Sequence, residues 1–168
     1  MTVEIKQTWL ADRFSRLFGK APAIVIEEVS AGLTEGSALL EREVIERTPT
    51  SGVGNLRNSI GALPVTLGGG SISAGAATSL AYALPVELGS KPHWAPIAPL
   101  IDWVIRRLAK HGDEAQEVAR MVQFKIARKG TKGHHMFRDA GEAIQPQFIA
   151  MMEKALDRAQ ARIEGQPA

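Results

Sequence analysis

Near its C-terminal end the chain carries a long run in which apolar residues recur at steps of three and four. Such spacing places side chains on one face of an α-helix. Asp139 and Glu142 are expected to cap the start of this helix, and Pro146 predicts a kink or a later start. The run is the clearest structural signal in the sequence, and its apolar residues are Ile144, Phe148, Met152, Leu156, Ala159 and Ile163.

A second helical pattern begins at Pro22, a residue well suited to the first turn of a helix. Charged residues occupy most of its other faces, and Pro49 predicts that it ends near Thr48. A short amphipathic helix within residues 1–19 precedes it and is a candidate arm. The stripe of the second helix consists of Val25, Val29, Leu33, Gly36, Leu40 and Val44.

The middle of the chain has a different character. Residues 56–78 are rich in Gly, Ser and β-branched residues and carry little charge, which predicts two strands, 59–67 and 71–77, in a hairpin. Residues 82–88 fit either a third strand or a short helical turn, and residues 97–130 contain a further pair of helices. We therefore predict a single α+β domain over residues 1–168, with a small antiparallel β-sheet packed against several long α-helices.

Composition excludes several functional classes. The 168 residues include no cysteine, and 20 Lys and Arg are nearly balanced by 18 Asp and Glu, which excludes disulfides and thiolate chemistry. The N-terminal stretch lacks the uninterrupted apolar core of a signal peptide or membrane span. Because the sequence also lacks a phosphate-binding loop, a nucleophile elbow and metal-ligand spacings, we expect no catalytic site, no cofactor and no metal.

One segment, residues 125–135, gathers basic side chains. It could contact nucleic acid phosphates. It could also be a helix C-terminus whose cations complement the helix dipole and whose glycines form the exit. The second interpretation is favoured because the aromatic residues that stack bases are missing. The basic residues are Lys125, Arg128, Lys129, Lys132, His134 and His135.

Two short motifs flank the predicted hairpin. The first follows the charged helix and contains Pro49, Gly54, Leu56, Arg57, Ser59 and Ile60; the second contains Tyr82, Ala83, Val86, Glu87 and Gly89. With the terminal "GHHMFRDA" before a long helix, this order of elements resembles the head-tail joining, or tail completion, family of neck and minor tail components in tailed bacteriophages and prophages. The chain departs from that pattern in the longer "GVGNLR", in Ser90 where Thr is usual, and in the inserted helical pair 97–130.

The resemblance implies a non-enzymatic virion protein, made in the host cytoplasm, that joins the head connector to the tail tube as a ring, commonly sixfold. Its implied partners are further copies of itself, head connector or adaptor proteins, the tail tube or its terminator protein, and DNA passing through the channel, but no membrane. One alternative is a tail terminator that caps the tube. An alternative of another class is a nucleic-acid-binding module that uses residues 125–135.

Three segments are candidate contacts between proteins. They are the loop 48–55, the hairpin tip 68–71 with Gly69, and the segment 90–96, in which His93 and Trp94 are candidate interface residues because Trp is enriched at binding hot spots. We also predict that Arg57 forms an ion pair with Glu87, because a partly buried arginine needs an acidic partner. Such a pair would pin the loop to the segment after the hairpin.

Overall fold

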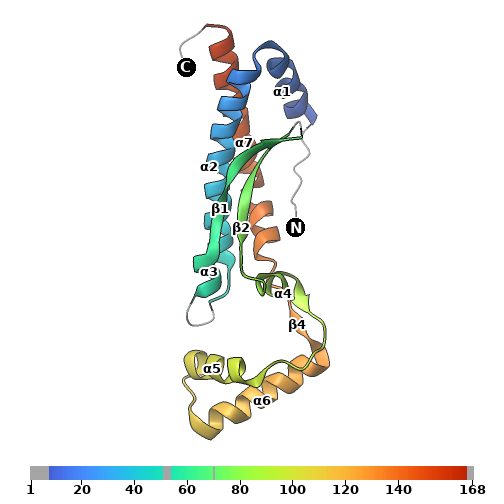
Figure 1. Ribbon diagram of the computed structural model, residues 1–168, viewed down its shortest axis with the longest axis vertical. Helices are drawn as coiled ribbons and strands as arrows, with labels where there is room; N and C mark the ends of the chain where they lie inside the picture. Colours follow the sequence, from blue (N-terminus) through green and yellow to red (C-terminus); the bar gives the residue numbers. More distant parts are fainter. Residues whose placement is uncertain (1–7, 51–53, 70, 166–168) are drawn as a thin grey trace. The chain divides into compact units, whose positions relative to one another are not determined.

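The computed structural model describes residues 8–50, 54–69 and 71–165 (Figure 1). These residues form seven helices and four short or medium strands, paired in two antiparallel sheets, so the predicted α+β class is confirmed. The chain divides into two compact units. Unit 1 contains residues up to 46, residues 60–77 and residues from 137 onward; unit 2 contains residues 47–59 and 78–136. The prediction of a single domain stays a prediction, and each unit is described by itself.

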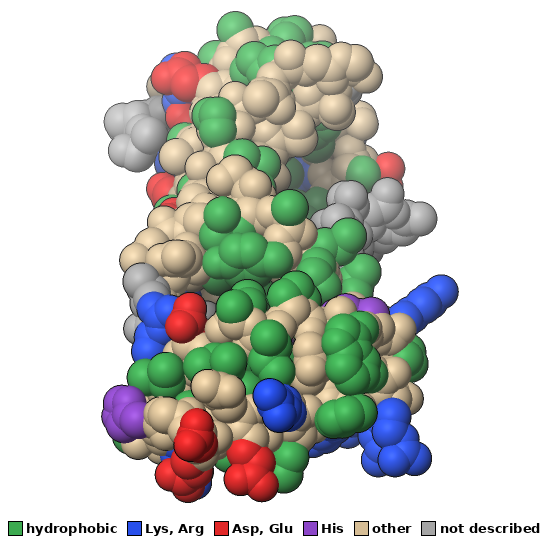
Figure 2. All heavy atoms as spheres, turned by 60° about the horizontal axis from the view of Figure 1, so that its bottom comes forward, with side chains coloured by type: hydrophobic (Ala, Val, Ile, Leu, Met, Phe, Trp, Pro, Cys, Tyr) green, Lys and Arg blue, Asp and Glu red, His purple; other side chains and the backbone are tan. Residues whose placement is uncertain are grey.

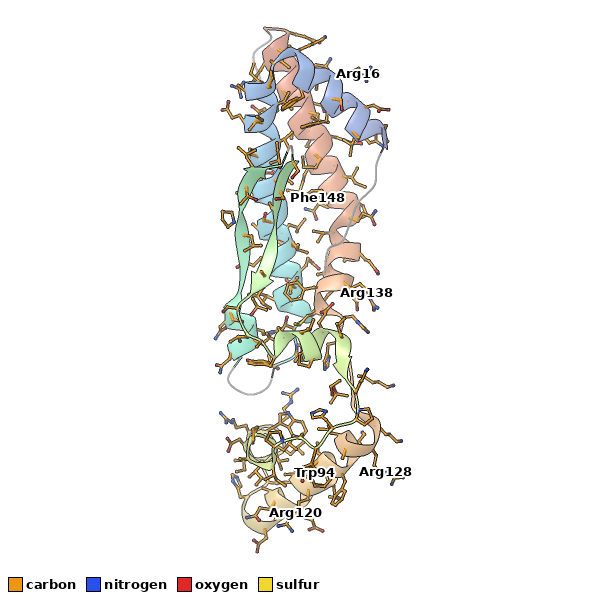
Figure 3. The ribbon with its side chains drawn as sticks, turned by 45° about the vertical axis from the view of Figure 1, so that its right-hand side comes forward. Arg16, Trp94, Arg120, Arg128, Arg138 and Phe148 are labelled. Carbon is orange, nitrogen blue, oxygen red and sulfur yellow. The ribbon has the colours of Figure 1, made fainter. Side chains whose placement is uncertain are left out.

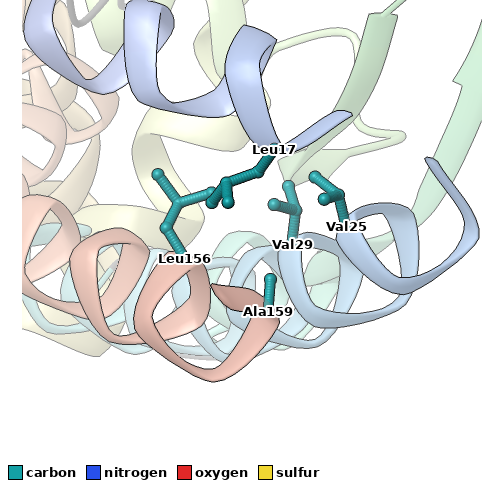
Figure 4. Packing of buried hydrophobic residues seen from close by; sticks show 5 residues of the cluster. All are labelled: Leu17, Val25, Val29, Leu156 and Ala159. Carbon is teal, nitrogen blue, oxygen red and sulfur yellow. The ribbon is translucent and has the colours of Figure 1, made fainter. Parts of the chain in front are cut away.

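Unit 1 is built on two long helices, α2 (Pro22–Arg47) and α7 (Met136–Ile163). They lie side by side and run in opposite directions (Figure 1). The shorter α1 (Thr8–Lys20) packs on them at one end. The predicted stripes meet here in a core cluster of Leu17, Val25, Val29, Leu156 and Ala159 (Figure 4).

Glycines set the close approach of α2 and α7. A Cβ atom added to Gly36 would lie 2.6 Å from Cε2 of Phe148, and one added to Gly32 would lie 3.2 Å from Cβ of Ala155. The ring of Phe148 therefore occupies space that only a glycine leaves open. Toward the end of α2 the buried leucine is Leu39 rather than the predicted Leu40, which borders an open hollow.

The hairpin consists of β1 (Ile60–Gly68) and β2 (Ser71–Thr78), close to the predicted strands. It runs along α2 and α7 in Figure 1, and Ile72 of β2 packs against the core cluster. The β1 side is more open, since Leu63 and Leu67 are 48% and 61% exposed. A small sheet packed against long helices is therefore confirmed.

Unit 2 is made of short elements and one helical pair, α5 (Ile97–Leu108) and α6 (Gly112–Lys129). Val104 of α5 packs on Ala115 and Ala119 of α6. Before this pair come α3 (Asn55–Ser59), α4 (Ala83–Leu88) and β3 (Gly89–Ser90), and after it comes β4 (Thr131–Lys132). The ambiguous segment 82–88 is thus helical.

The expected cap of the last helix is wrong. Helix α7 begins at Met136, so Asp139 lies within its first turn, and Pro146 lies inside the helix. The chain just before the helix is fixed by backbone hydrogen bonds from His134 and His135. These bonds link segments distant in sequence and hold the chain directly before the helix start.

Candidate interaction surfaces

The first motif folds around a buried threonine. Thr48 is 2% exposed, and its hydroxyl lies 3.2 Å from Sδ of Met136. Nε of Arg57 donates to the carbonyl oxygen of Thr48 at 3.0 Å. Arg57 therefore ties α3 back to the end of α2. The prediction of an ion pair with Glu87, whose side chain is buried at 4% exposure, stays a prediction.

Gly54 begins the short helix of this motif. Its φ of +71° lies in the region that favours glycine, and its carbonyl oxygen accepts from the backbone N–H of Asn58 at 3.0 Å. Leu56 and Ile60 are buried. Pro49 lies directly after the buried threonine. Residues 51–53 of the candidate contact loop 48–55 lie outside the described residues.

Ser59 closes the motif with its side chain. Its hydroxyl donates to the carbonyl oxygen of Leu56 at 2.8 Å and lies 2.6 Å from the hydroxyl of Thr78. The same threonine oxygen accepts from the backbone N–H of Leu80 at 3.2 Å. The serine of the motif therefore links the end of α3 to the chain that leaves the hairpin.

The second motif is pinned to the segment after α6. The carbonyl oxygens of Val86 and Glu87 accept from the backbone N–H groups of His134 at 2.8 Å and His135 at 3.0 Å. Next along the chain, Gly89 pairs with Lys132 in the β3–β4 ladder. Ala83 is buried and Tyr82 is 46% exposed. These contacts bring the tyrosine motif and the basic segment together.

The backbone segments 86–90 and 130–135 contact each other closely, and we call this contact the glycine crossing. Three glycines make it possible. A Cβ atom would lie 2.4 Å from the carbonyl oxygen of Thr131 at Gly89, 1.9 Å from that of Ser90 at Gly130, and 2.4 Å from that of Glu87 at Gly133. Two of the three also have positive φ, +82° at Gly89 and +68° at Gly130. The backbones touch where no side chain fits.

This crossing gives the basic segment a structural role. Gly130 ends α6, and its N–H donates to the carbonyl oxygen of Ile126 at 2.8 Å. Arg128 and Lys129 occupy the last turn of the helix, where cations interact favourably with the helix dipole. The helix-end interpretation of residues 125–135 accounts for these positions without a nucleic acid ligand.

Trp94, a predicted interface residue, lies on an ordered surface. It is 62% exposed, and its ring meets Phe124 edge to face with centroids 5.2 Å apart. The buried Gln123 donates from Nε2 to the carbonyl oxygen of Ala95 at 2.6 Å, which holds the tryptophan segment on α6. His93, also predicted, lies exposed with Nδ1 2.9 Å from the carbonyl oxygen of Lys91.

The sequence reasoning missed the α6 side of this surface. Phe124 and Met121 are 56% and 59% exposed, and they lie opposite the buried Ala115 and Ala119. Two large apolar residues three apart, away from a stripe of small ones, were the available signal.

Unit 1 has an open hollow between the hairpin and the two long helices. Its volume is about 470 Å³. Arg138 and Phe148 both border it, and Figure 3 shows them on α7. The remaining lining is mostly small or apolar and includes Gly36, Leu40, Leu63 and Gly75. The predicted contact residue Gly69 lies at the exposed hairpin tip with φ +58°.

A charged network joins the first part of α2 to the last part of α7 in unit 1. The carboxylate of Glu28, 13% exposed, accepts from Arg158 at 2.8 Å and from Arg162 at 2.7 Å. The pKa of Glu28 lies below its ordinary value of 4.5, first because of the hydrogen bond from Arg158 and then because of that from Arg162. Partners in this geometry are typical of a structural network.

Within the part of the chain that the structure describes, no three His, Asp or Glu side chains are placed to hold a metal ion. None of the described helices is both long and apolar enough to cross a membrane. Two exposed regions remain as candidate interaction surfaces, the segment around Trp94 with Phe124 and the hairpin with its hollow.

Comparison with known proteins bears on residues 12–89. This segment matches the sequence model of a family described as "Bacteriophage HK97-gp10, putative tail-component". It runs from α1 to the start of β3 and includes both motifs. No curated protein and no solved structure matches the chain. The predicted resemblance to a phage tail-protein family is confirmed: over residues 12–89, the chain is similar to the HK97-gp10-like family of phage tail components.

Proposed function

We propose that this protein is a non-enzymatic component of the phage virion that joins the head connector to the tail tube. It is made in the host cytoplasm and acts at the neck as a closed ring, with six copies as the expected number. The observation that carries the proposal is the match of residues 12–89 to a family of tail components. That segment contains both motifs on which the resemblance to joining proteins rests.

The exposed faces support a role in assembly. A ring needs two different surfaces on each copy, because head-to-tail contacts generate rotational symmetry. The hairpin offers one candidate, since a two-stranded sheet leaves main-chain groups along both outer edges and exposes Leu63 and Leu67. The segment 90–96 with His93 and Trp94 offers another. The motif residues Arg57, Ser59 and Gly89 stabilise unit 2, which carries the segment 90–96.

The test is the particle made by a phage that lacks this protein. A joining protein leaves filled heads and tails of normal length that stay separate, and the purified protein added back restores joined particles. A tail terminator, in contrast, leaves tails of uncontrolled length. Overlong tails, or joined infectious particles without the protein, would contradict the joining role.

Solution mass tests the ring itself. Light scattering over a concentration series should show a species that approaches six times the mass of one chain, alone or once a partner is added. Leu63→Ser with Leu67→Ser should weaken it, whereas Thr66→Ser on the same exposed strand should not. DNA binding that falls steeply with salt, and that is lost when Lys129 and Lys132 are changed to Gln, would favour the nucleic-acid-binding alternative.

A further inference from the structure

The exposed face of α6 carries a regular stripe. Side chains that follow one another at steps of three and four share one face of a helix, as in a coiled-coil seam. The stripe lies opposite Ala115 and Ala119, which pack on α5. Its members are all exposed and are Glu114, Glu117, Met121, Phe124 and Arg128.

Acidic, apolar and basic side chains follow one another in a regular order along this stripe. Two carboxylates come first, two large apolar side chains lie in the middle, and Arg128 comes last, with Lys125 beside it. Acidic residues at the start and basic residues at the end of a helix complement its dipole, which explains the charges. The dipole does not explain why Met121 and Phe124 face water at 59% and 56% exposure.

The apolar centre is held in a defined geometry. Trp94 packs edge to face on Phe124, and the buried hydrogen bond from Gln123 to Ala95 fixes the tryptophan segment against the helix. Figure 3 shows Trp94 close to α6, with Arg120 and Arg128 on that helix. Hydrophobic, acidic and basic side chains lie near one another on the face that Figure 2 turns forward. Such ordered, exposed aromatic residues are typical of binding hot spots.

We propose that this stripe binds the same stripe of a second copy of this chain, with the two α6 helices antiparallel. A two-fold axis between Met121 and Phe124 then places each of these residues against the other in the partner. It also places Glu117 opposite Arg128 of the partner, twice. The contact is isologous, which means that both copies use the same surface. The acidic end of the stripe on one copy therefore meets the basic end of the stripe on the other.

Charge complementarity favours this occupant over others. A nucleic acid would meet Glu114 and Glu117 at the start of the stripe, and like charges directly opposed are unfavourable. An acidic peptide would meet the same carboxylates. An antiparallel copy supplies the opposite charge at both ends and an apolar surface in the middle. The inference goes beyond the proposed ring and does not depend on the joining role.

Charge reversal tests the contact. Sedimentation of the full chain should show a dimer that forms with increasing concentration. Glu117→Arg or Arg128→Glu alone should weaken it about tenfold, since two pairs of roughly 0.2–1 kcal/mol each turn repulsive. The double variant should restore the dimer, and a mixture of the two single variants should form a heterodimer. A wild type that stays monomeric at millimolar concentration, or a double variant as weak as the singles, would overturn the proposal.

Cross-linking tests the register, whatever the size of the assembly. The chain contains no cysteine, so Met121→Cys and Phe124→Cys introduce the only thiols. Under oxidation a mixture of these variants should cross-link faster than either alone, and Glu117→Arg should slow the cross-link about tenfold. Gln116→Cys, exposed on another face of the same helix, is the matched control. Equal cross-linking at positions 116 and 121 would show that the stripe is not the contact.

Discussion

The two units of this chain are stabilised in different ways. Unit 1 fills its centre with branched side chains from three helices, such as Leu156 against Val25 and Val29. Unit 2 has a small core in which Val104 meets two alanines, and its chain segments are joined by backbone contacts around Gly89, Gly130 and Gly133. In unit 1 the glycines make room for packed side chains, whereas in unit 2 they let backbone segments touch.

The largest effect is expected at the glycine crossing. Gly130→Ala places a Cβ atom 1.9 Å from the carbonyl oxygen of Ser90 and strains a backbone with φ +68°. Overpacking and backbone strain each cost about 1–3 kcal/mol, so we expect a loss of roughly 2–6 kcal/mol. Urea denaturation with hydrogen exchange should show unit 2 opening while the α2–α7 amides of unit 1 stay protected.

Two control variants separate the causes. Gly112→Ala has a similar φ of +57° but nothing within 4 Å of the added Cβ atom, so it tests backbone strain alone. Gly19→Ala has neither strain nor a close neighbour and should be neutral or slightly stabilising. If Gly130→Ala costs no more than Gly112→Ala, the crossing is looser than the contacts of unit 2 indicate.

The next effect is expected in the core of unit 1. Leu156 is 2% exposed, and removing its side chain in Leu156→Ala leaves a cavity among Leu17, Val25 and Val29. Such substitutions cost about 2–5 kcal/mol. The midpoint of urea unfolding measures this loss. Leu67→Ala, on the exposed strand β1, should change it little, and equal losses at both positions would contradict the packing described for unit 1.

Sequence periodicity predicted unit 1 well because its stability comes from side chains that leave a pattern. The stripe through Leu156, the end of α2 before Pro49 and the hairpin were confirmed, and the stripe through Val25 was confirmed except at Leu40. Gly36 was placed on the stripe, but its close contact with the ring of Phe148 was not predicted. A contact between a glycine and a ring from a distant helix leaves no periodic trace.

Unit 2 was less predictable because its main contacts also join segments far apart in sequence, and such contacts leave no periodic pattern. The motif residues Arg57 and Glu87 were singled out, but the backbone contact of Glu87 with His135 and the bond from the Arg57 side chain to the carbonyl oxygen of Thr48 were not predicted. Gly130 and Gly133 were read as a helix exit, and nothing in their spacing indicated that they meet Ser90 and Glu87. Pairings between segments far apart in sequence depend on the fold as a whole.

A smaller effect, dependent on pH, is expected at Glu28. Its folded-state pKa is lowered from the ordinary value of 4.5 by hydrogen bonds from Arg158 and Arg162, so its contribution is present above that value and is lost as pH falls through the lower folded value. Glu28→Gln should therefore cost roughly 1–3 kcal/mol at pH 7 and progressively less below about pH 4. Urea unfolding at several pH values measures the difference.

The matched control is Asp157→Asn. Asp157 is 63% exposed and pairs with Arg13 at 2.7 Å, so its loss should cost only about 0.2–1 kcal/mol. A difference between wild type and Glu28→Gln that persists undiminished at pH 2 would show that shape, rather than charge, is what Glu28 contributes to unit 1.

The smallest effect compares one chemical pair in the two units. The hydroxyls of Ser59 and Thr78 lie 2.6 Å apart in a half-buried part of unit 2, and those of Thr66 and Ser73 lie 2.9 Å apart on the exposed hairpin of unit 1. Double-mutant cycles with Ser→Ala and Thr→Val isolate each pairwise coupling. We expect about 1 kcal/mol for the half-buried pair and about 0.2 kcal/mol for the exposed pair, because water competes for the exposed hydroxyls. Equal couplings would mean that unit 2 does not gain from shielded polar contacts, and its stability would then rest on the glycine crossing and on buried side chains such as Val104 and Met136.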